Sequence, residues 1–217
     1  VMACVDAGRE RDMLDMLAEM ERKYPGWYET MLARTLVEDI LDHREEAVQA
    51  FDAMKQKFPF AAKDLTGLEG ALRARAGLEG ASELVKTWLS GLGEPGAEDV
   101  EAYAYALLCE GDLKGAREAL EKAEALVPEA APENASKIAD AWIMIETCRA
   151  ELLLAEGDLE GCVAALEKAA SYGWPAWSLA VYPAFQEVYA SQAYQALLDK
   201  LPAQPAEWDL SQMPEIP

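Results

Sequence analysis

A chain of 217 residues with 40 acidic and 19 basic side chains carries a formal net charge of −21. That balance argues against nucleic acid and anionic membranes as partners, because affinity for phosphate comes mainly from Lys and Arg. The 40 alanines and the scarcity of Val, Ile and Thr predict an all-α protein. No uncharged apolar run approaches the roughly 20 residues that cross a bilayer, and the first residues lack the pattern of a signal peptide.

The four cysteines are widely spaced without a CxxC pair, and the chain has one histidine, so neither a disulfide framework nor a zinc site is expected. Each cysteine lies in an alanine-rich apolar stretch. We interpret Cys4, Cys109, Cys148 and Cys162 as thiols in a reducing compartment, which predicts a cytoplasmic protein. No cofactor is expected.

The dominant pattern is a repeated turn followed by an amphipathic helix. An anchor residue recurs at spacings of 34, 34, 35 and 46 residues, and apolar residues follow each anchor four and seven positions later. The anchors are Met13, Ala47, Ala81, Ala116 and Cys162; the residues four positions on are Leu17, Phe51, Val85, Leu120 and Leu166. Offsets of four and seven lie on one face of a helix, so this face is expected to be buried.

Proline follows three of the anchors at a distance of 12 residues, at Pro25, Pro59 and Pro128, where it is expected to end the helix. One helix pair cannot bury its apolar stripe alone, and stacking of neighbouring pairs makes a continuous core. The period, the small anchors and the prolines resemble the tetratricopeptide repeat (TPR) family over about residues 1–200. The resemblance implies an α-solenoid of helix-turn-helix repeats with a C-terminal helical cap.

The first helices of the repeats match the family less closely than the second. Ala104 takes the expected small position, with Val100, Tyr103 and Leu107 as its large neighbours. Charged residues fall at Arg34-Thr35 and Glu69-Gly70, where the family has apolar ones. The predicted division of the chain is a partial first repeat (second helix only) at 1–25, repeats at 26–59, 60–95, 96–128 and 129–175, capping helices at 176–201 and an acidic Pro-rich tail at 202–217.

The repeat at 129–175 contains 12 extra residues, because its anchor spacing is 46 rather than 34. They predict a lengthened first helix that starts near Pro132-Glu133-Asn134-Ala135-Ser136 and reaches Ala155. In the tail that follows the cap, Trp208 is a candidate anchor onto the array.

The two ends of the array carry separate expectations. A half-repeat leaves Met2, Val5 and Met16 in need of a cover, which predicts either further repeats or another domain upstream, or a dimer contact. The segment from Tyr182 to Leu198 is similar to the closing segment of many bacterial TPR arrays. Such arrays are often fused to winged-helix regulators, nucleotide cyclases or kinases, so the resemblance implies a bacterial regulator.

Three candidate chemical sites have simpler structural interpretations. The GxGxxG pattern at 91–96 follows an expected helix rather than a strand and contains Pro95, so we interpret it as a loop between repeats. His43 has no nucleophile or proton donor beside it in the sequence and is expected to be an exposed turn residue. The aromatic residues Tyr172, Trp174, Trp177 and Tyr182 are either a ligand pocket or, as we favour, the core of the cap.

The remaining candidate is the concave groove that the resemblance implies along the first helices. The residues expected to line it are Arg75, Glu101, Tyr105, Leu108, Thr147 and Glu151. With Glu98, Asp99 and Glu146 nearby, this groove is expected to be acidic and to favour a basic peptide or a basic partner domain. The alternative is that these residues form solvated helix faces.

The function expected from these patterns is that of a non-catalytic protein–protein interaction or sensor module, a scaffold that presents its groove to a protein segment or to an upstream domain. A second hypothesis is an accessory TPR domain of a multidomain enzyme, of cyclase or kinase type, whose catalytic part lies outside this chain. A third is that the chain is itself an all-helical enzyme.

Overall fold

The structure is a computed structural model that describes residues 1–60, 65–129, 131 and 134–201. Within these ranges it is helical and contains no strand, as the composition predicts. The helices are α1 (Met2–Asp6), α2 (Glu10–Lys23), α3 (Tyr28–Ile40), α4 (Arg44–Lys57), α6 (Thr66–Arg75), α7 (Ala81–Gly91), α8 (Ala97–Cys109), α9 (Leu113–Leu126), α10 (Ala135–Ala155), α11 (Leu159–Ser171), the 3-10 helices η1 (Ala176–Val181) and η2 (Pro183–Phe185), α12 (Gln186–Ala190) and α13 (Gln192–Leu198).

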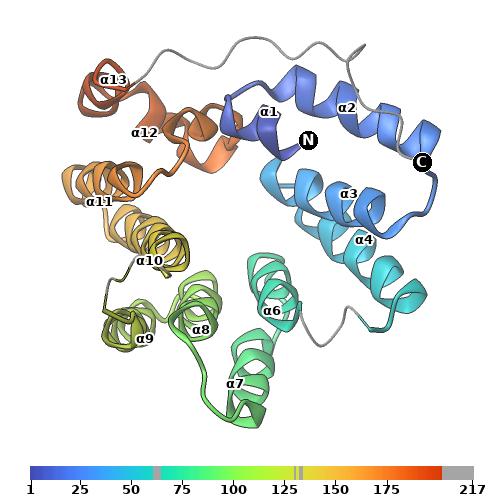
Figure 1. Cartoon of the computed structure of the whole chain (residues 1–217), viewed down its shortest axis with the longest axis horizontal. Coiled ribbons are helices and arrows are strands. Elements are labelled where there is room, and N and C mark those ends of the chain that lie inside the picture. The colour runs from blue at the N-terminus through green and yellow to red at the C-terminus, as the bar shows by residue number, and fades with distance from the viewer. Residues whose placement is uncertain (61–64, 130, 132–133, 202–217) are drawn as a thin grey trace. The chain divides into compact units, whose positions relative to one another are not determined.

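The chain folds into two compact units. One unit is Phe51–Trp174, and the other combines Val1–Ala50 with Pro175–Pro217, so the boundary falls within α4. In the first of these units consecutive helices pack as pairs, α6 with α7, α8 with α9 and α10 with α11, and α8 also contacts α6, α7 and α10 (Figure 1). In the other unit α1 packs on α2 and on η1, and α2 packs on α3.

Five turns share one backbone geometry. In each, the second residue after the helix that precedes the turn is left-handed, with φ between 62° and 84°; these residues are Gly8, Asp42, Gly77, Gly111 and Gly157. Its N–H bonds a carbonyl three residues back, and the next N–H bonds a carbonyl five residues back, as in Gly111 to Leu108 and Asp112 to Leu107, both at 2.9 Å. This is the Schellman motif, which stops a helix by satisfying its last carbonyls. The structure thus repeats at the positions where the sequence repeats.

The second helices end and begin where their sequence predicts. Helices α2, α4 and α9 end at Lys23, Lys57 and Leu126, each two residues before a proline, because the residue ahead of proline avoids helical geometry. At the other end, the Asp112 and Asp158 carboxylates accept the Gly115 and Gly161 N–H groups at 2.9 Å and cap α9 and α11.

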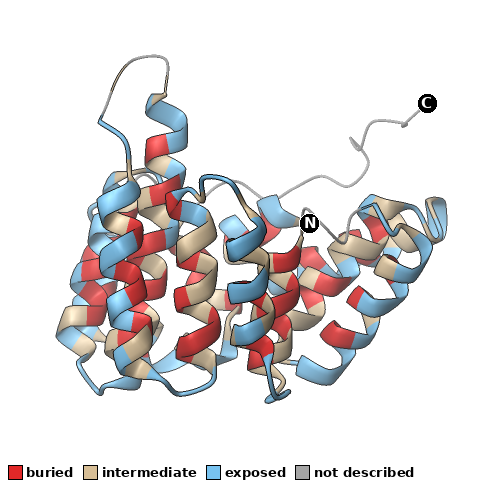
Figure 2. Ribbon diagram, turned by 90° about the horizontal axis from the view of Figure 1, so that it is seen from below, coloured by how far each residue is buried: buried red, intermediate tan, exposed pale blue. Residues whose placement is uncertain are grey.

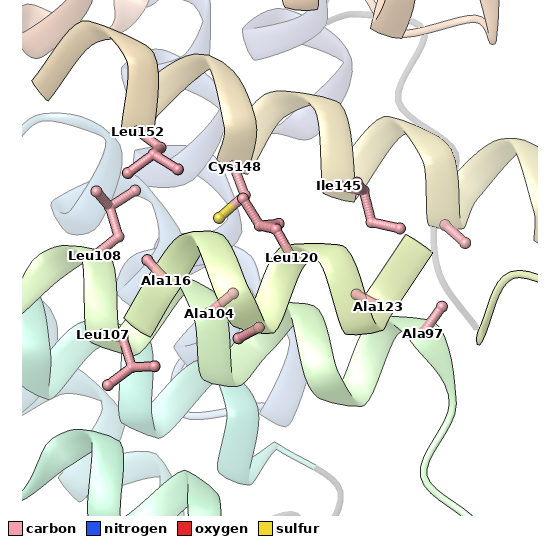
Figure 3. Packing of buried hydrophobic residues seen from close by; sticks show 12 residues of the cluster. Ala97, Ala104, Leu107, Leu108, Ala116, Leu120, Ala123, Ile145, Cys148 and Leu152 are labelled. Atoms are coloured by element: carbon pink, nitrogen blue, oxygen red, sulfur yellow. The ribbon is translucent and has the colours of Figure 1, made fainter. Parts of the chain in front are cut away.

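The predicted apolar face of the second helices is buried except at Met20 and Trp88, two of the residues seven positions after an anchor, which are half-buried. All five anchors are at most 2% exposed, and the apolar residues four positions later are at most 4% exposed. Helices show buried stripes next to exposed ones (Figure 2). In the largest cluster the small residues of α8 and α9 face one another, and Ile145, Cys148 and Leu152 of α10 turn toward them (Figure 3). Small side chains at these positions let helices approach closely, and larger ones fill the gaps between them.

The first helices also carry a small buried residue, at Thr35, Gly70, Ala104 and Ala150. Gly70 of α6 lies so close to α7 that a Cβ atom there would overlap Val85 Cγ2. The neighbouring charges are accommodated differently. Arg34 is exposed and pairs with Glu21 and Glu38, whereas Glu69 is 4% exposed and is neutralised by Lys55 at 2.7 Å and Arg73 at 3.0 Å.

The lengthened helix of the last pair is confirmed, since α10 runs from Ala135 to Ala155 and is 21 residues long. Asn134 precedes it, but its side chain bonds the Ala131 N–H and the Glu129 carbonyl instead of capping the helix. Pro132 and Glu133 lie outside the described residues, as do the tail 202–217 and Trp208.

The ends of the described chain meet in one core. Val181 of η1 is buried in one cluster with Cys4, Val5 and Met16, and Tyr182 packs against that cluster. Val5 and Met16, which the sequence left in need of a cover, are therefore buried, while Met2 stays 44% exposed. Tyr194 of α13 is fully buried, and its hydroxyl donates to the Ala176 carbonyl.

Candidate functional site

The candidate surface is formed by α8 and α10, two helices in contact, beside the end of α6. Glu101, Tyr105 and Leu108 follow one another on α8 at offsets of four and three, and Thr147 and Glu151 lie four apart on α10. Arg75 is the last residue of α6, a neighbour of α8, and is half-buried. The helices thus bring together the elements that carry the predicted groove residues, but the side chains differ sharply in exposure.

Glu101 is the most perturbed carboxyl group of this surface. It is 6% exposed, and burial raises its pKa to about 8, with further increases from the charges of Glu151 and Glu98, while a hydrogen bond with the Cys148 thiol acts the other way. At neutral pH the group therefore holds its proton for most of the time. The surface carries less negative charge than its sequence predicts.

Cys148 packs behind this carboxyl group and is 2% exposed. Burial raises the pKa of its thiol well above the ordinary value, and the carboxyl groups of Glu101 and Glu151 raise it further. A reactive cysteine needs an electropositive, accessible setting that favours the thiolate. Cys148 is therefore a structural thiol; of the four cysteines, Cys109 is partly exposed and the other three are buried.

Two further groove candidates have structural roles in the core or within their own helix. Leu108 is 8% exposed and belongs to the core cluster of α8, α9 and α10, so its side chain packs between helices. The Thr147 hydroxyl donates to the Ile143 carbonyl at 2.8 Å, one turn back on α10. Tyr105 on α8 and Glu151 on α10 are partly exposed, as is Thr147.

The nearby acids that were expected to add to the groove have structural partners. The Asp99 carboxylate accepts the Gly96 N–H at 2.7 Å and so caps α8. Glu146 is 1% exposed and binds Lys168 at 2.7 Å and Arg149 at 3.3 Å. Glu98 alone of these three is exposed. Asp99 and Glu146 thus add less negative charge to the candidate surface than the sequence predicts.

A paired aromatic group beside Glu146 was not predicted from the sequence. Trp142 of α10 stacks on Tyr172 with ring centroids 5.8 Å apart, and the Lys168 ammonium lies 4.5 Å from the centre of the Trp142 ring. Tyr182 instead contacts Phe185 edge-to-face and packs on the core of α1–α3. Tyr172 and Tyr182, which were expected in one cap core, therefore pack in different places, Tyr172 on Trp142 of α10 and Tyr182 on the core of α1–α3. Periodicity could not have shown this, because the stack joins residues 30 positions apart.

The other sequence motifs take the structural roles expected of them. The GxGxxG segment runs from the last residue of α7 to the residue before α8, and the Gly96 N–H donates to the Asp99 carboxylate. His43 is exposed in the α3–α4 turn with its Nδ1 2.8 Å from Glu38. Burial raises the pKa of Glu38, but hydrogen bonds from His43 and Arg34 outweigh it and leave that pKa below its usual value.

Among the described residues, no three or more His, Cys, Asp or Glu side chains are grouped so that they could hold a metal ion. In the same part of the chain, no helix is both long enough and apolar enough to cross a membrane. Comparison with protein-family models, with curated proteins and with solved structures found no match.

Proposed function

We propose that the chain is an α-solenoid of TPR-like repeats that works as a non-catalytic interaction or sensor module. The observation that carries this proposal is the fivefold recurrence of the same Schellman turn. Each turn is followed, four or five residues later, by an anchor that is at most 2% exposed. Repeats of this kind bury a continuous core between neighbouring pairs and leave one helix row to face a ligand.

The proposed binding surface is the row of first helices at α8 and α10, and its partner is a protein segment or another domain of the parent protein. Glu151 and Glu98 supply negative charge there, and Tyr105 supplies a partly exposed ring. A basic segment fits this surface best, because complementary charge speeds association and selects the partner. Catalytic chemistry is not needed for this role.

The test is a charge reversal with a matched control. Glu151→Lys on α10 and Glu118→Lys on the exposed face of α9 change the net charge equally, but only the first lies on the proposed surface. We expect Glu151→Lys to weaken binding of Arg- and Lys-rich peptides from an array by about tenfold, with affinity that falls as salt rises. Equal effects of the two variants, or binding only to acidic peptides, would reject this surface.

The second hypothesis, an accessory domain of a cyclase- or kinase-type enzyme, uses the same repeats and is supported by the resemblance of the segment from Tyr182 to Leu198 to bacterial closing segments. The full-length open reading frame distinguishes the two. A basic helix-turn-helix region would favour a regulator, and a cyclase or kinase signature would favour the enzyme.

A further inference from the structure

The C-terminal segment 175–201, which we call the strap, is built from elements too short to be stable alone. Its helices η1, η2, α12 and α13 contain 6, 3, 5 and 7 residues. Isolated helices shorter than about 12 residues are marginal in water, so packing must supply their order. The strap is therefore ordered by its internal contacts and by the surface on which it docks.

The internal contacts of the strap are substantial. Tyr194 is fully buried and its hydroxyl binds the Ala176 carbonyl, which ties α13 to the start of η1. The Gln186 amide donates to the carbonyls of Ala180 at 3.2 Å and Tyr182 at 3.3 Å. Val188 is also fully buried. These contacts join the first and last elements of the strap, so it can move as one piece.

The docking surface is the turn between α1 and α2 together with the apolar core beneath it. Helix η1 packs on α1, and Val181 enters the core that contains Cys4 and Val5. Gly8, in its left-handed conformation with φ of 66°, lies so close that a Cβ atom would overlap the Trp177 carbonyl and approach Ala180 Cβ to 3.0 Å. The strap and the first turn thus meet backbone to backbone.

We propose that the strap is a releasable closure: it docks on α1 and α2 as a unit, opens without unfolding of the rest of the chain, and thereby covers or presents the apolar surface of Cys4, Val5 and Met16. These three residues are 0%, 1% and 6% exposed in the closed state. Segments that open separately have few buried apolar contacts with the rest of the core. The strap reaches the α1–α3 cluster through Val181, which is buried there, and through Tyr182, which packs against it.

The test compares two glycines that differ only in what their Cβ would meet. Gly8→Ala and Gly77→Ala both place alanine at a left-handed turn position, with φ of 66° and 69°, but nothing lies within 4 Å of a Cβ at Gly77. We expect Gly8→Ala in the full chain to speed hydrogen exchange of strap amides by about tenfold, because overpacking weakens docking. Amides of α8 and α9 should be unchanged, and Gly77→Ala should leave the strap unaffected.

Thiol labelling gives an independent measure of opening. Cys4 and Cys162 are both fully buried, but only Cys4 lies in the core that the strap covers. In Gly8→Ala the labelling of Cys4 should accelerate while that of Cys162 does not. Tyr194→Phe, which removes the hydroxyl bond to Ala176, should give the same pattern more weakly and serves if Gly8→Ala does not fold.

Two results would overturn the proposal. In the first, exchange in the strap and in α2 and α3 accelerates by the same factor, which would mean that the strap unfolds only with the core. In the second, the strap responds equally to Gly8→Ala and Gly77→Ala, or to neither, which would mean that the contact at Gly8 does not hold it.

Discussion

The close approach of α6 and α7 at Gly70 allows a prediction with an internal check. A Cβ atom at this position would overlap Val85 Cγ2 and lie 3.6 Å from the Ala81 carbonyl, and Val85 is fully buried. Overpacking of a core costs about 1–3 kcal/mol, whereas alanine in a helix gains about 1 kcal/mol over glycine. Because the Cβ atom would overlap Val85 Cγ2 directly, the cost lies at the upper end of that range, and we expect Gly70→Ala to lower the free energy of unfolding by about 2 kcal/mol.

The check is a double-mutant cycle with Val85→Ala, which removes the overlapping methyl group. Residues in direct contact couple by about 0.5–3 kcal/mol, so Gly70→Ala should cost less, or stabilise, in the Val85→Ala background. Gly91→Ala is the control, because Gly91 ends the neighbouring helix α7 and nothing lies within 4 Å of its Cβ. Urea denaturation followed by far-ultraviolet circular dichroism measures all four proteins of the cycle and the control. The packing argument would be refuted if the effects of Gly70→Ala and Val85→Ala on the free energy of unfolding were additive, or if Gly70→Ala were as stable as the unchanged protein.

Three further predictions concern the unit of residues 51–174. Ala116→Leu should destabilise the protein by about 1–3 kcal/mol because Ala116 is fully buried between α8 and α9, and a neutral result in denaturation would place it outside that interface. For Glu101, the pKa in the folded state is about 8 against 4.5 in the unfolded chain, so its contribution to stability is complete below about pH 4.5 and is lost as the pH rises through 8. Glu101→Gln should therefore flatten the decline in stability between pH 5 and pH 8, an effect of a few kcal/mol at about 1.4 kcal/mol per pKa unit, and an unchanged slope would count against the buried acid. Lys168→Met should cost about 1–2 kcal/mol because Glu146 loses one of its two partners in a buried site, and no cost in denaturation would show that Arg149 alone satisfies the carboxylate.

The second helices were predictable because their signal is periodic and local. Ala47, Ala81 and Ala116 and the larger residues that follow them form one stripe, and a stripe of this kind has to be buried wherever the helix packs. The prolines after α2, α4 and α9 act on the backbone directly and need no tertiary context. The 12 extra residues before Cys162 could likewise be read as a longer helix.

The first helices were harder to predict, because a charged residue on them can either stay exposed or be buried beside a residue of opposite charge. Arg34 is exposed, while Glu69 and Glu146 are buried and paired with lysines 14 and 22 residues away. Whether such a partner reaches a given carboxylate depends on how neighbouring helices cross, which no local pattern records. The crossing of the helices also decides that Leu108 belongs to the core, whereas Glu151 and Tyr105 stay partly exposed on the candidate surface.

What the sequence determines by itself is the set of local backbone choices: helices with a 3.6-residue apolar stripe, left-handed turns at Gly8, Gly77, Gly111 and Gly157, and helix ends before proline. These depend on sterics and hydrogen bonds within a few residues. The protonated state of Glu101, the stack of Trp142 on Tyr172 and the docking of η1 on α1 were decided only by the tertiary structure. Each brings together residues distant in sequence, and burial, charge and contact at such places are properties of the packed core.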